Sequence, residues 1–429
     1  MTKSTQFAAC LLGGALALFT VPASATSLVS IADFTVDSGG HPYAAVTFDN
    51  VVGRQGILYT TTSGLAGTCY EQYGCGSVVA LSPPAAPGGA WTLNVLHKFT
   101  GPDGSVPYAG LIFDSFGAMY GTTAHGGLGA CYDNFGCGTV FKLSPPSTPG
   151  GTWTLTTLYA FTGPDGGNPT GNLIFDSFGA LYGTTVAGGA KAGSGVVYKL
   201  TPPATPSGAW TQNIIHAFSG LDGARPRANL IFDTHGALYG TTERGGPANL
   251  GTVFALTPPS TPGAAWTQTV LLNFRGPDGA QAFQNLQFDT TGALYSTAWK
   301  GGLNNGGTAF KLTPPAALGG NWMESYYQFD DPRSNTLQGG LLRNAFGDFI
   351  GTTNRGGSGD CAKTHCGTVF KLIAPTTLGG AWTHTVLADF DGVNGGNPEV
   401  TPTFHLGAYY GTADYGGTSN VGTIFQFIP

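Results

Sequence analysis

Charged residues are scarce in this sequence. They make up 9% of its 429 residues, and glutamate occurs at four positions, Glu71, Glu243, Glu324 and Glu399. The net charge of −6 argues against a nucleic-acid-binding protein, which normally presents a basic face. The aromatic content of 12% is too high for a disordered chain. Because 70 Gly and 28 Pro recur at regular places, we expect a turn-rich all-β protein.

Signatures of catalysis are missing as well. No glutamate is paired with a second acid at the short spacing that would propose a glycosidase dyad. No Gly-x-Ser-x-Gly motif marks a nucleophilic serine. The sequence therefore predicts no cofactor, no metal and no catalytic residue, and an enzyme is the less favoured class.

A repeated motif is what the sequence does contain. Residues 172–185 read Asn-Leu-Ile-Phe-Asp-Ser-Phe-Gly-Ala-Leu-Tyr-Gly-Thr-Thr, and near-copies occur at 110–123 and 229–242. More divergent copies occupy residues 285–298, 340–353 and 400–413. Two apolar runs joined by Asp-x-x-Gly are typical of a β-hairpin, since Asp suits the first turn position and Gly the left-handed one.

Each repeat predicts four strands. The first is of the Leu-Ile-Phe-Asp type, the second is Ala-Leu-Tyr-Gly-Thr-Thr, the third is Gly-Thr-Val-Phe-Lys-Leu, and the fourth opens with Trp-Thr and ends in Phe. Third strands start at seven positions: Gly76, Gly138, Gly195, Gly251, Gly307, Gly367 and Gly422. Fourth strands start at six: Trp91, Trp153, Trp210, Trp266, Trp322 and Trp382.

The missing fourth strand has a candidate at the other terminus. Residues 27–34 form a strand without a hairpin partner, and their end, Ile-Ala-Asp-Phe, matches Leu-Ala-Asp-Phe at 387–390. We therefore predict a seven-bladed β-propeller of four-stranded antiparallel blades, closed by the N-terminal strand. A linear β-solenoid, the alternative, would not need complete sets of strands. No composition shift divides the ring, so residues 26–429 are expected to be one domain.

Residues 1–25 resemble a signal peptide. Lys3 gives the positive start, residues 7–21 the apolar core, and Ala23-Ser24-Ala25 the small-residue cleavage site. The apolar stretch is shorter than the ~20 residues of a membrane span, so no span is expected in the mature chain. We predict a secreted or periplasmic protein, and a monomer.

Six cysteines outside this segment form three close couples, each before a third strand. Disulfides are favoured within each couple because they suit an oxidising compartment. Zinc is the alternative, but ligands at suitable spacing do not accompany all three couples. The couples are Cys69 with Cys75, Cys131 with Cys137, and Cys361 with Cys366.

The full repeat, Leu-Tyr-Gly-Thr-Thr-x-x-Gly-Gly…Gly-Thr-Val-Phe-Lys-Leu, resembles the GloVer tandem repeat of exported bacterial proteins, over nearly all of the mature chain. The hairpin alone is similar to units of other propellers. The resemblance implies export and a repeat protein of undefined activity, often with a C-terminal sorting anchor. This chain departs from that pattern, since it ends in the strand-like residues 425–429. The resemblance therefore supports secretion or periplasmic residence and gives no assignment to an anchored surface protein.

Two sets of polar residues are candidates for function. Asp103, Asp165, Asp222 and Asp278 recur in the Phe-x-Gly-Pro-Asp-Gly links between blades. They could suggest calcium, but each site offers one carboxylate where calcium takes six to eight oxygens, and Asp-Gly is ordinary turn chemistry. We interpret them as turn formers.

The second set lies between Gly-Thr-Thr and Gly-Gly, where each repeat inserts a variable dipeptide in a constant frame. These loops share one face with the links. Aromatic and cationic side chains there suit sugars or acidic polymers; the alternative is a solvated loop whose cations pair with the Asp-Gly links. The candidate ligand-binding residues are His125, Arg244, Trp299, Lys300, Arg355 and Tyr415.

The sequence thus predicts an exported, non-catalytic binding or scaffold propeller for extracellular polysaccharide or protein. The alternative is a polysaccharide-directed hydrolase or lyase with its site at the channel mouth. His41 and His405 are the candidate pair for that alternative, because both lie near first strands of neighbouring blades.

Overall fold

The protein is described by a computed structural model of the chain. It covers residues 26–429 except 50, 52–53, 55, 65, 67–68, 70–73, 87, 128, 130, 132–134, 149, 190–192, 206–207, 262, 318–319, 332–333, 360, 362–365 and 378. The predicted signal peptide, residues 1–25, lies outside the described residues, as does Glu71. Within the described part, no helix is long and apolar enough to cross a membrane.

The strands fall into the four predicted types. First strands are β2 (Thr47–Phe48), β6 (Ile112–Phe113), β10 (Ile174–Phe175), β14 (Ile231–Phe232), β18 (Gln287–Phe288), β23 (Leu341–Arg343) and β28 (Thr403–His405). Second strands are β3 (Leu58–Thr62), β7 (Met119–Thr123), β11 (Leu181–Thr185), β15 (Leu238–Thr242), β19 (Leu294–Ala298), β24 (Phe349–Thr353) and β29 (Ala408–Ala413).

The outer two types complete the set. Third strands are β4 (Ser77–Ser82), β8 (Thr139–Ser144), β12 (Val196–Thr201), β16 (Thr252–Thr257), β20 (Thr308–Thr313), β26 (Thr368–Ile373) and β30 (Thr423–Ile428). Fourth strands are β5 (Thr92–Lys98), β9 (Thr154–Ala160), β13 (Thr211–Ala217), β17 (Thr267–Asn273), β21 (Met323–Gln328), β27 (Thr383–Asp389) and β1 (Ser27–Asp33). Two short strands, β22 (Ser334–Asn335) and β25 (Arg355–Gly356), pair separately, and η1 (Leu303–Asn305) is one 3-10 turn.

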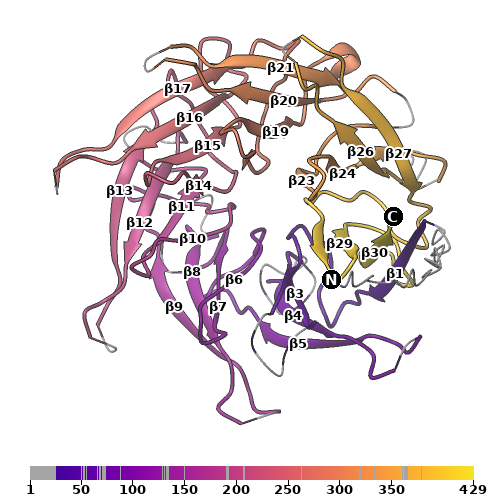
Figure 1. Ribbon diagram of the computed structural model, residues 1–429. Coiled ribbons are helices and arrows are strands. Elements are labelled where there is room, and N and C mark those ends of the chain that lie inside the picture. The colour runs from indigo at the N-terminus through magenta and orange to yellow at the C-terminus, as the bar shows by residue number, and fades with distance from the viewer. Residues whose placement is uncertain are drawn as a thin grey trace, which may run out of the picture.

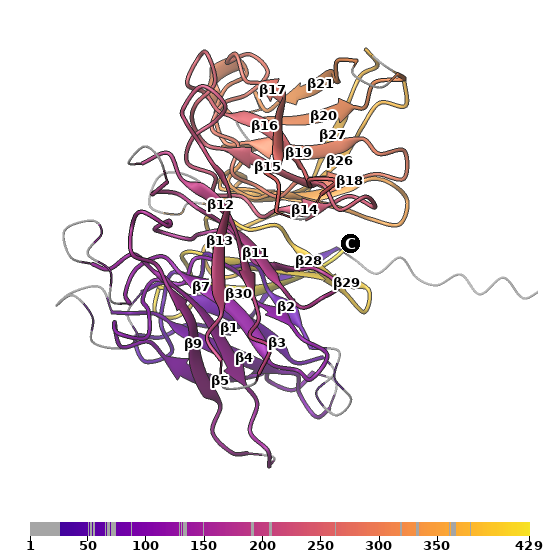
Figure 2. The same ribbon diagram turned by 90° about the vertical axis from the view of Figure 1, so that its left-hand side faces the viewer.

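The strands make seven four-stranded antiparallel blades arranged as a β-propeller, which confirms the predicted fold (Figure 1). Blades 1 to 7 begin with β2, β6, β10, β14, β18, β23 and β28. Blade 7 has the order β28-β29-β30-β1, so the N-terminal strand completes the C-terminal blade as predicted. First strands lie nearest the centre of the ring and fourth strands outside; the 90° view shows β9 and β13 from outside (Figure 2).

The Asp-x-x-Gly hairpin owes its shape to its aspartate. Oδ1 of Asp114 accepts hydrogen bonds from the backbone N–H groups of Phe116 and Ala118, both at 2.9 Å, and Oδ2 accepts one from the Tyr120 hydroxyl. Burial opposes ionisation of this carboxyl, but the N–H donors and the tyrosine outweigh it, so the pKa of Asp114 lies below its usual value. The repeated Asp and Tyr are therefore one structural unit.

The second strand of the repeat is buried in every blade, except that Tyr239 of β15 is half-buried, and its small residues are required there. A Cβ on Gly121 would lie 2.6 Å from Cζ of Phe141 in the neighbouring third strand, so glycine makes room for that ring. Threonine hydroxyls donate to carbonyls of the next blade: Thr61 to Pro107 and Ala109, and Thr412 of blade 7 to Ala44 of blade 1. Six of the seven blades are tied to the next blade by such a bond, and the exception is blade 4, where the Thr241 hydroxyl has no partner among the described residues.

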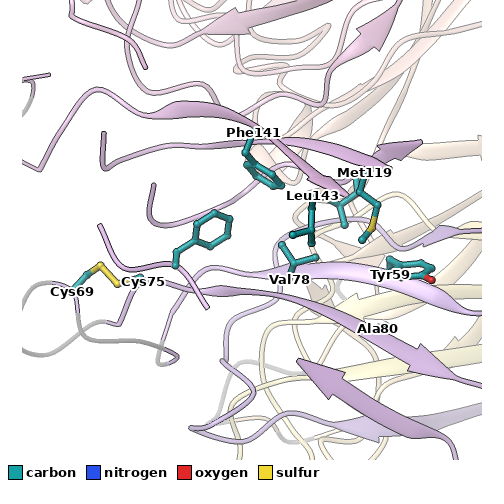
Figure 3. Packing of buried hydrophobic residues seen from close by; sticks show 10 residues of the cluster. Tyr59, Cys69, Cys75, Val78, Ala80, Met119, Phe141 and Leu143 are labelled. Carbon is teal, nitrogen blue, oxygen red and sulfur yellow. A yellow bond between two sulfur atoms is a disulfide. The ribbon is translucent and has the colours of Figure 1, made fainter. Parts of the chain in front are cut away.

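Seven hydrophobic clusters fill the boundaries between successive blades. Between blades 1 and 2, Tyr59 and Val78 of one blade pack against Met119, Phe141 and Leu143 of the other (Figure 3). The fixed place of the tryptophan within each repeat has the same origin, since the Trp ring of one blade contacts the second-strand Tyr of the preceding blade. The core is therefore a ring of interfaces.

In six of the seven blades, the loop between the second and third strands is closed by one of two alternative devices. Disulfides join Cys69 to Cys75, Cys131 to Cys137 and Cys361 to Cys366, which confirms the three predicted couples. In blades 4, 5 and 7 a shorter turn replaces the disulfide: Asn249, Asn305 and Asn420 adopt positive φ, and their side chains accept hydrogen bonds from Gly245, Gly301 and Gly416. An Asn side chain tolerates that backbone conformation and closes the turn.

Candidate functional site

Each link between blades contains one residue near the axis whose backbone conformation and backbone hydrogen bonds are the same in every blade. That residue has φ near +60° in every blade, and in five of the seven it precedes proline. Its N–H donates to the carbonyl that precedes a third-strand glycine, and its own carbonyl accepts from the first residue of the variable dipeptide. The seven framed residues are His41, Val106, Asn168, Arg225, Gln281, Thr336 and Asn397.

Two positions further on, each link places a side chain at the centre of the ring. We call this set the inner ring: Tyr43, Tyr108, Thr170, Arg227, Phe283, Gln338 and Glu399. All but Gln338 line one cavity of about 280 Å³, together with deeper first-strand positions that include Asn172, Asn229 and Asn285. The mouth of the propeller channel is therefore a cavity whose side chains differ from blade to blade.

Aromatic rings form part of the wall of this cavity. The Tyr43 and Tyr108 rings lie 5.5 Å apart between centroids. Phe283 contacts Trp299 edge to face, at 5.8 Å, and the Arg227 guanidinium lies over Phe283 at 5.5 Å. Apolar faces next to polar groups are typical of small-molecule sites.

One side of the mouth is acidic. Glu399 accepts a hydrogen bond from the Asn354 amide at 3.0 Å. Burial, and then the Asp414 carboxylate, raise the pKa of Glu399 to about 8, against the opposing effects of Asn354 and Arg227. Asp414 in turn lies 2.8 Å from Nδ1 of His41. Burial together with these acids also raises the pKa of Tyr43, so its hydroxyl stays protonated.

The opposite side is basic. Glu243, with a side chain 9% exposed, lies within 3.5–3.7 Å of Arg225, Arg227 and Arg244. The Lys300 ammonium lies 4.3 Å from the centroid of the Trp299 ring. Blades 4 and 5 therefore bring four cations and one carboxylate to the mouth, while blade 7 brings Glu399 and Asp414.

The six candidates predicted from the sequence lie around the cavity, and none of them lines it. Arg244, Trp299 and Lys300 adjoin the inner ring through Arg227 and Phe283, and Tyr415 contacts His41 at 5.8 Å. His125 contacts Phe135, and burial lowers the pKa of its imidazole. Arg355 is exposed on β25.

The variable dipeptides are not free loop tips. The second residues of all six dipeptides pair with the links, as in Ser105 with His125 and Asn335 with Arg355, and their first residues are mostly buried. Two of the cations have partners other than the Asp-Gly links that the solvated-loop interpretation requires: Arg244 pairs with Glu243, and Lys300 lies over Trp299. The link aspartates instead close their own turns, as in Asp103 with the Thr100 N–H and hydroxyl.

The candidate pair His41 and His405 does not form. His41 belongs to the mouth, whereas His405 ends β28 at the hairpin on the opposite side of the blade and stacks on Phe48 at 4.0 Å. Among the described residues, no group of three His, Cys, Asp or Glu side chains could hold a metal ion.

Sequence reasoning missed the inner ring. Its signal was present: the residue after the link proline varies from Tyr to Thr, Arg and Glu within a repeated frame, which is the same evidence that singled out the dipeptides. The Gloeobacter/Verrucomicrobia repeat model matches residues 46–281 and 233–429. The chain belongs to this family. Among the copies of the Gloeobacter/Verrucomicrobia repeat in this chain, the residue type varies at the inner-ring position and at the two dipeptide positions.

Two solved structures show low similarity to this repeat protein. One is a protein of unknown function from Dyadobacter fermentans, with 13% identity, 74% of this chain and 92% of that chain covered, and a TM-score of 0.41. Another is a putative oxidoreductase (glucose dehydrogenase) from Thermus thermophilus, with 18% identity, 74% and 95% covered, and a TM-score of 0.40. No curated protein matches the sequence.

Proposed function

We propose that this protein is an exported binding module that takes a saccharide at the mouth of the propeller channel. The observation that carries the proposal is the convergence of the inner ring on one cavity. The fold holds the link backbone with the same hydrogen bonds in every blade, so it places no common demand on the side chains that follow. A ligand that presents a different chemical group to each blade would explain why the inner-ring side chains differ from blade to blade.

The chemistry of the cavity suits a sugar. Sugars present C–H faces that pack on aromatic rings and hydroxyls that pair with planar polar groups. The mouth supplies Tyr43, Tyr108 and Phe283 for the first role, and Glu399 with the channel asparagines for the second. The volume of about 280 Å³ lies at the lower end of ligand pockets, which favours one or two sugar units.

Unpaired polar atoms support the same proposal. Within the described residues, buried side-chain atoms without a hydrogen-bond partner include Oγ1 of Thr170 and of Thr401, both lining the cavity, and Nε1 of Trp299. Buried polar groups are normally satisfied by protein, water or ligand. The six residues predicted from the sequence would form the rim of this site, where a longer chain could continue outward.

Export is part of the proposal. Three disulfides support an oxidising compartment, such as the periplasm or the extracellular medium. The hydrolase or lyase alternative has less support, because its candidate pair, His41 and His405, is separated.

A glycan array probed with the mature chain, followed by calorimetric titration of the saccharides retained, tests the proposal. Tyr108→Ala and Phe283→Ala remove stacking surfaces of the cavity and should weaken binding about tenfold or more, the equivalent of about 1.4 kcal/mol. Phe178→Ala is the matched control, since that ring is 88% exposed at a hairpin tip, and it should bind unchanged. Failure to bind any saccharide, or equal affinities for all three variants, would overturn the proposal.

A further inference from the structure

Three arginines share one buried carboxylate beside the cavity. Arg225 Nε, Arg227 Nη1 and Arg244 Nε lie 3.6, 3.5 and 3.7 Å from oxygens of Glu243. We call these four residues the arginine cluster. One carboxylate balances one of the three guanidinium charges, so the cluster keeps an excess of two positive charges. The whole chain carries a net charge of −6, and this excess therefore does not reflect a generally basic protein.

The donors of the cluster are incompletely satisfied. Nε of Arg225 and Nε of Arg244 are buried and face Glu243 at 3.6 and 3.7 Å, which is too long for a hydrogen bond, and they have no other hydrogen-bond partner among the described residues. A guanidinium group presents its N–H donors in a fixed fork that matches a carboxylate. Partly buried like charges and unpaired donors are costly unless something of opposite charge binds them.

The cluster reaches the saccharide cavity through Arg227. Arg227 lines the cavity and lies over Phe283, whose ring contacts Trp299, the residue under the Lys300 ammonium. A ligand whose ring lies in the cavity could place an acid group among these cations. At the far end of the cavity, burial and then the Asp414 carboxylate raise the pKa of Glu399 to about 8, so this side disfavours a negative charge.

We propose that the mouth recognises an acidic saccharide: the ring of a uronic acid binds in the cavity, with its carboxylate held by Arg225, Arg227 and Arg244. This inference rests on the proposed function and names the class of ligand. In the sequence-based interpretation, acidic polymers bind dipeptide residues of several blades. Here the acid group is instead recognised by the arginines of one blade, blade 4. The side of the ligand nearest Glu399 and Asp414 is uncharged.

Paired ligands separate this inference from the proposed function. Oligomers of galacturonate, mannuronate, guluronate and glucuronate are titrated calorimetrically beside their carboxyl-reduced counterparts, which keep the rings and lose the charge. At least one acidic oligomer should bind ten times or more tighter than its reduced partner, and salt at about 0.5 M should remove most of the difference, since exposed charges are screened. Equal binding of both forms overturns the inference alone. No binding by either form also overturns the inference, whereas these titrations overturn the proposed function only if the glycan array retains no saccharide at all.

Variants locate the acid group. Arg227→Gln and Arg244→Gln should each weaken the acidic oligomer at least fivefold and leave the reduced oligomer unchanged. Arg275→Gln is the matched control, because Arg275 is an exposed link residue outside the cluster, and its affinity should equal that of the wild type. Equal losses for acidic and reduced oligomers, or a loss in the control as large as in the cluster variants, would contradict the assignment.

Discussion

His41 Nδ1 lies 2.8 Å from Asp414 Oδ1, although 373 positions separate the two residues in the sequence. His41 belongs to the link that enters blade 1, and Asp414 follows the second strand of blade 7. The hydrogen bond to Asp414 raises the pKa of His41, against the opposing effect of burial. The pair therefore joins the two ends of the ring at the channel mouth, next to the β1–β30 pairing that closes blade 7.

The first prediction concerns this closure. A chain that begins at Val36 lacks β1 and should be several kcal/mol less stable, because it leaves the edge of β30 unpaired. The truncation also removes Leu28 and Ile31, which pack against two core clusters. Burial of each side chain contributes up to about 1.5–3 kcal/mol to the free energy of unfolding. Thermal unfolding followed by circular dichroism measures the effect. Identical melting temperatures for the shortened and the mature chains would show that β1 does not close the ring.

A second prediction concerns the disulfides. Their short loops, with sequence separations of 6, 6 and 5, predict about 2 kcal/mol of stabilisation each on the chain-entropy model. A reducing agent should therefore lower the melting temperature of the wild type. A variant with all six cysteines replaced by alanine should melt lower and show no response to the reductant. A wild-type melting temperature that survives complete reduction, verified by thiol counting, would refute this contribution.

The third prediction is the pH dependence of stability. The pKa of Glu399 is raised to about 8, above the unfolded value of about 4.3. Its contribution is therefore fully present below about pH 4.3 and is lost as the pH rises to about 8, by up to about 3–5 kcal/mol. Glu399→Gln keeps an acceptor for Asn354 and removes the ionisation, so it should flatten the fall in the free energy of unfolding over this window.

Denaturant unfolding of both proteins at several pH values measures that difference. Glu324→Gln is a useful companion, since burial raises the pKa of Glu324 to about 7 at a separate place on β21. Glu324→Gln should remove the share of the fall in the free energy of unfolding with rising pH that is due to Glu324. Parallel curves for the wild type and Glu399→Gln would show that the mouth carboxyl does not titrate in this range.

The fold was predictable because the number of copies of each strand type in the sequence indicates the number of blades and the strands in each blade. Seven third-strand starts against six fourth-strand tryptophans required a displaced strand, and residues 27–34 supplied it. The structure differs by one residue, with β1 ending at Asp33. The positions of Asp, Tyr, Gly and Trp within the repeat follow from contacts that every blade makes, so they recur and can be read from the sequence.

The site was less predictable, for a physical reason. The dipeptides stood out as variable, but the sequence does not show that their backbone continues the pairing with the links. Asp414 and Glu243 are buried as a result, and their partners His41 and Arg225 lie in links that read as ordinary turns. Contacts between non-repeated residues of different blades, such as Arg227 and Glu399 lining one cavity, follow only from the closed ring.

Hydroxyl-radical footprinting of the mature chain, with and without a saccharide retained by the glycan array, tests the central claim most directly. We predict that the ligand protects Tyr43, Tyr108 and Phe283 at the mouth. Phe116 and Phe178, exposed at the hairpin tips of the other face, should be oxidised equally in both samples. Protection of the hairpin-tip phenylalanines with an unprotected mouth would contradict the assignment of the site.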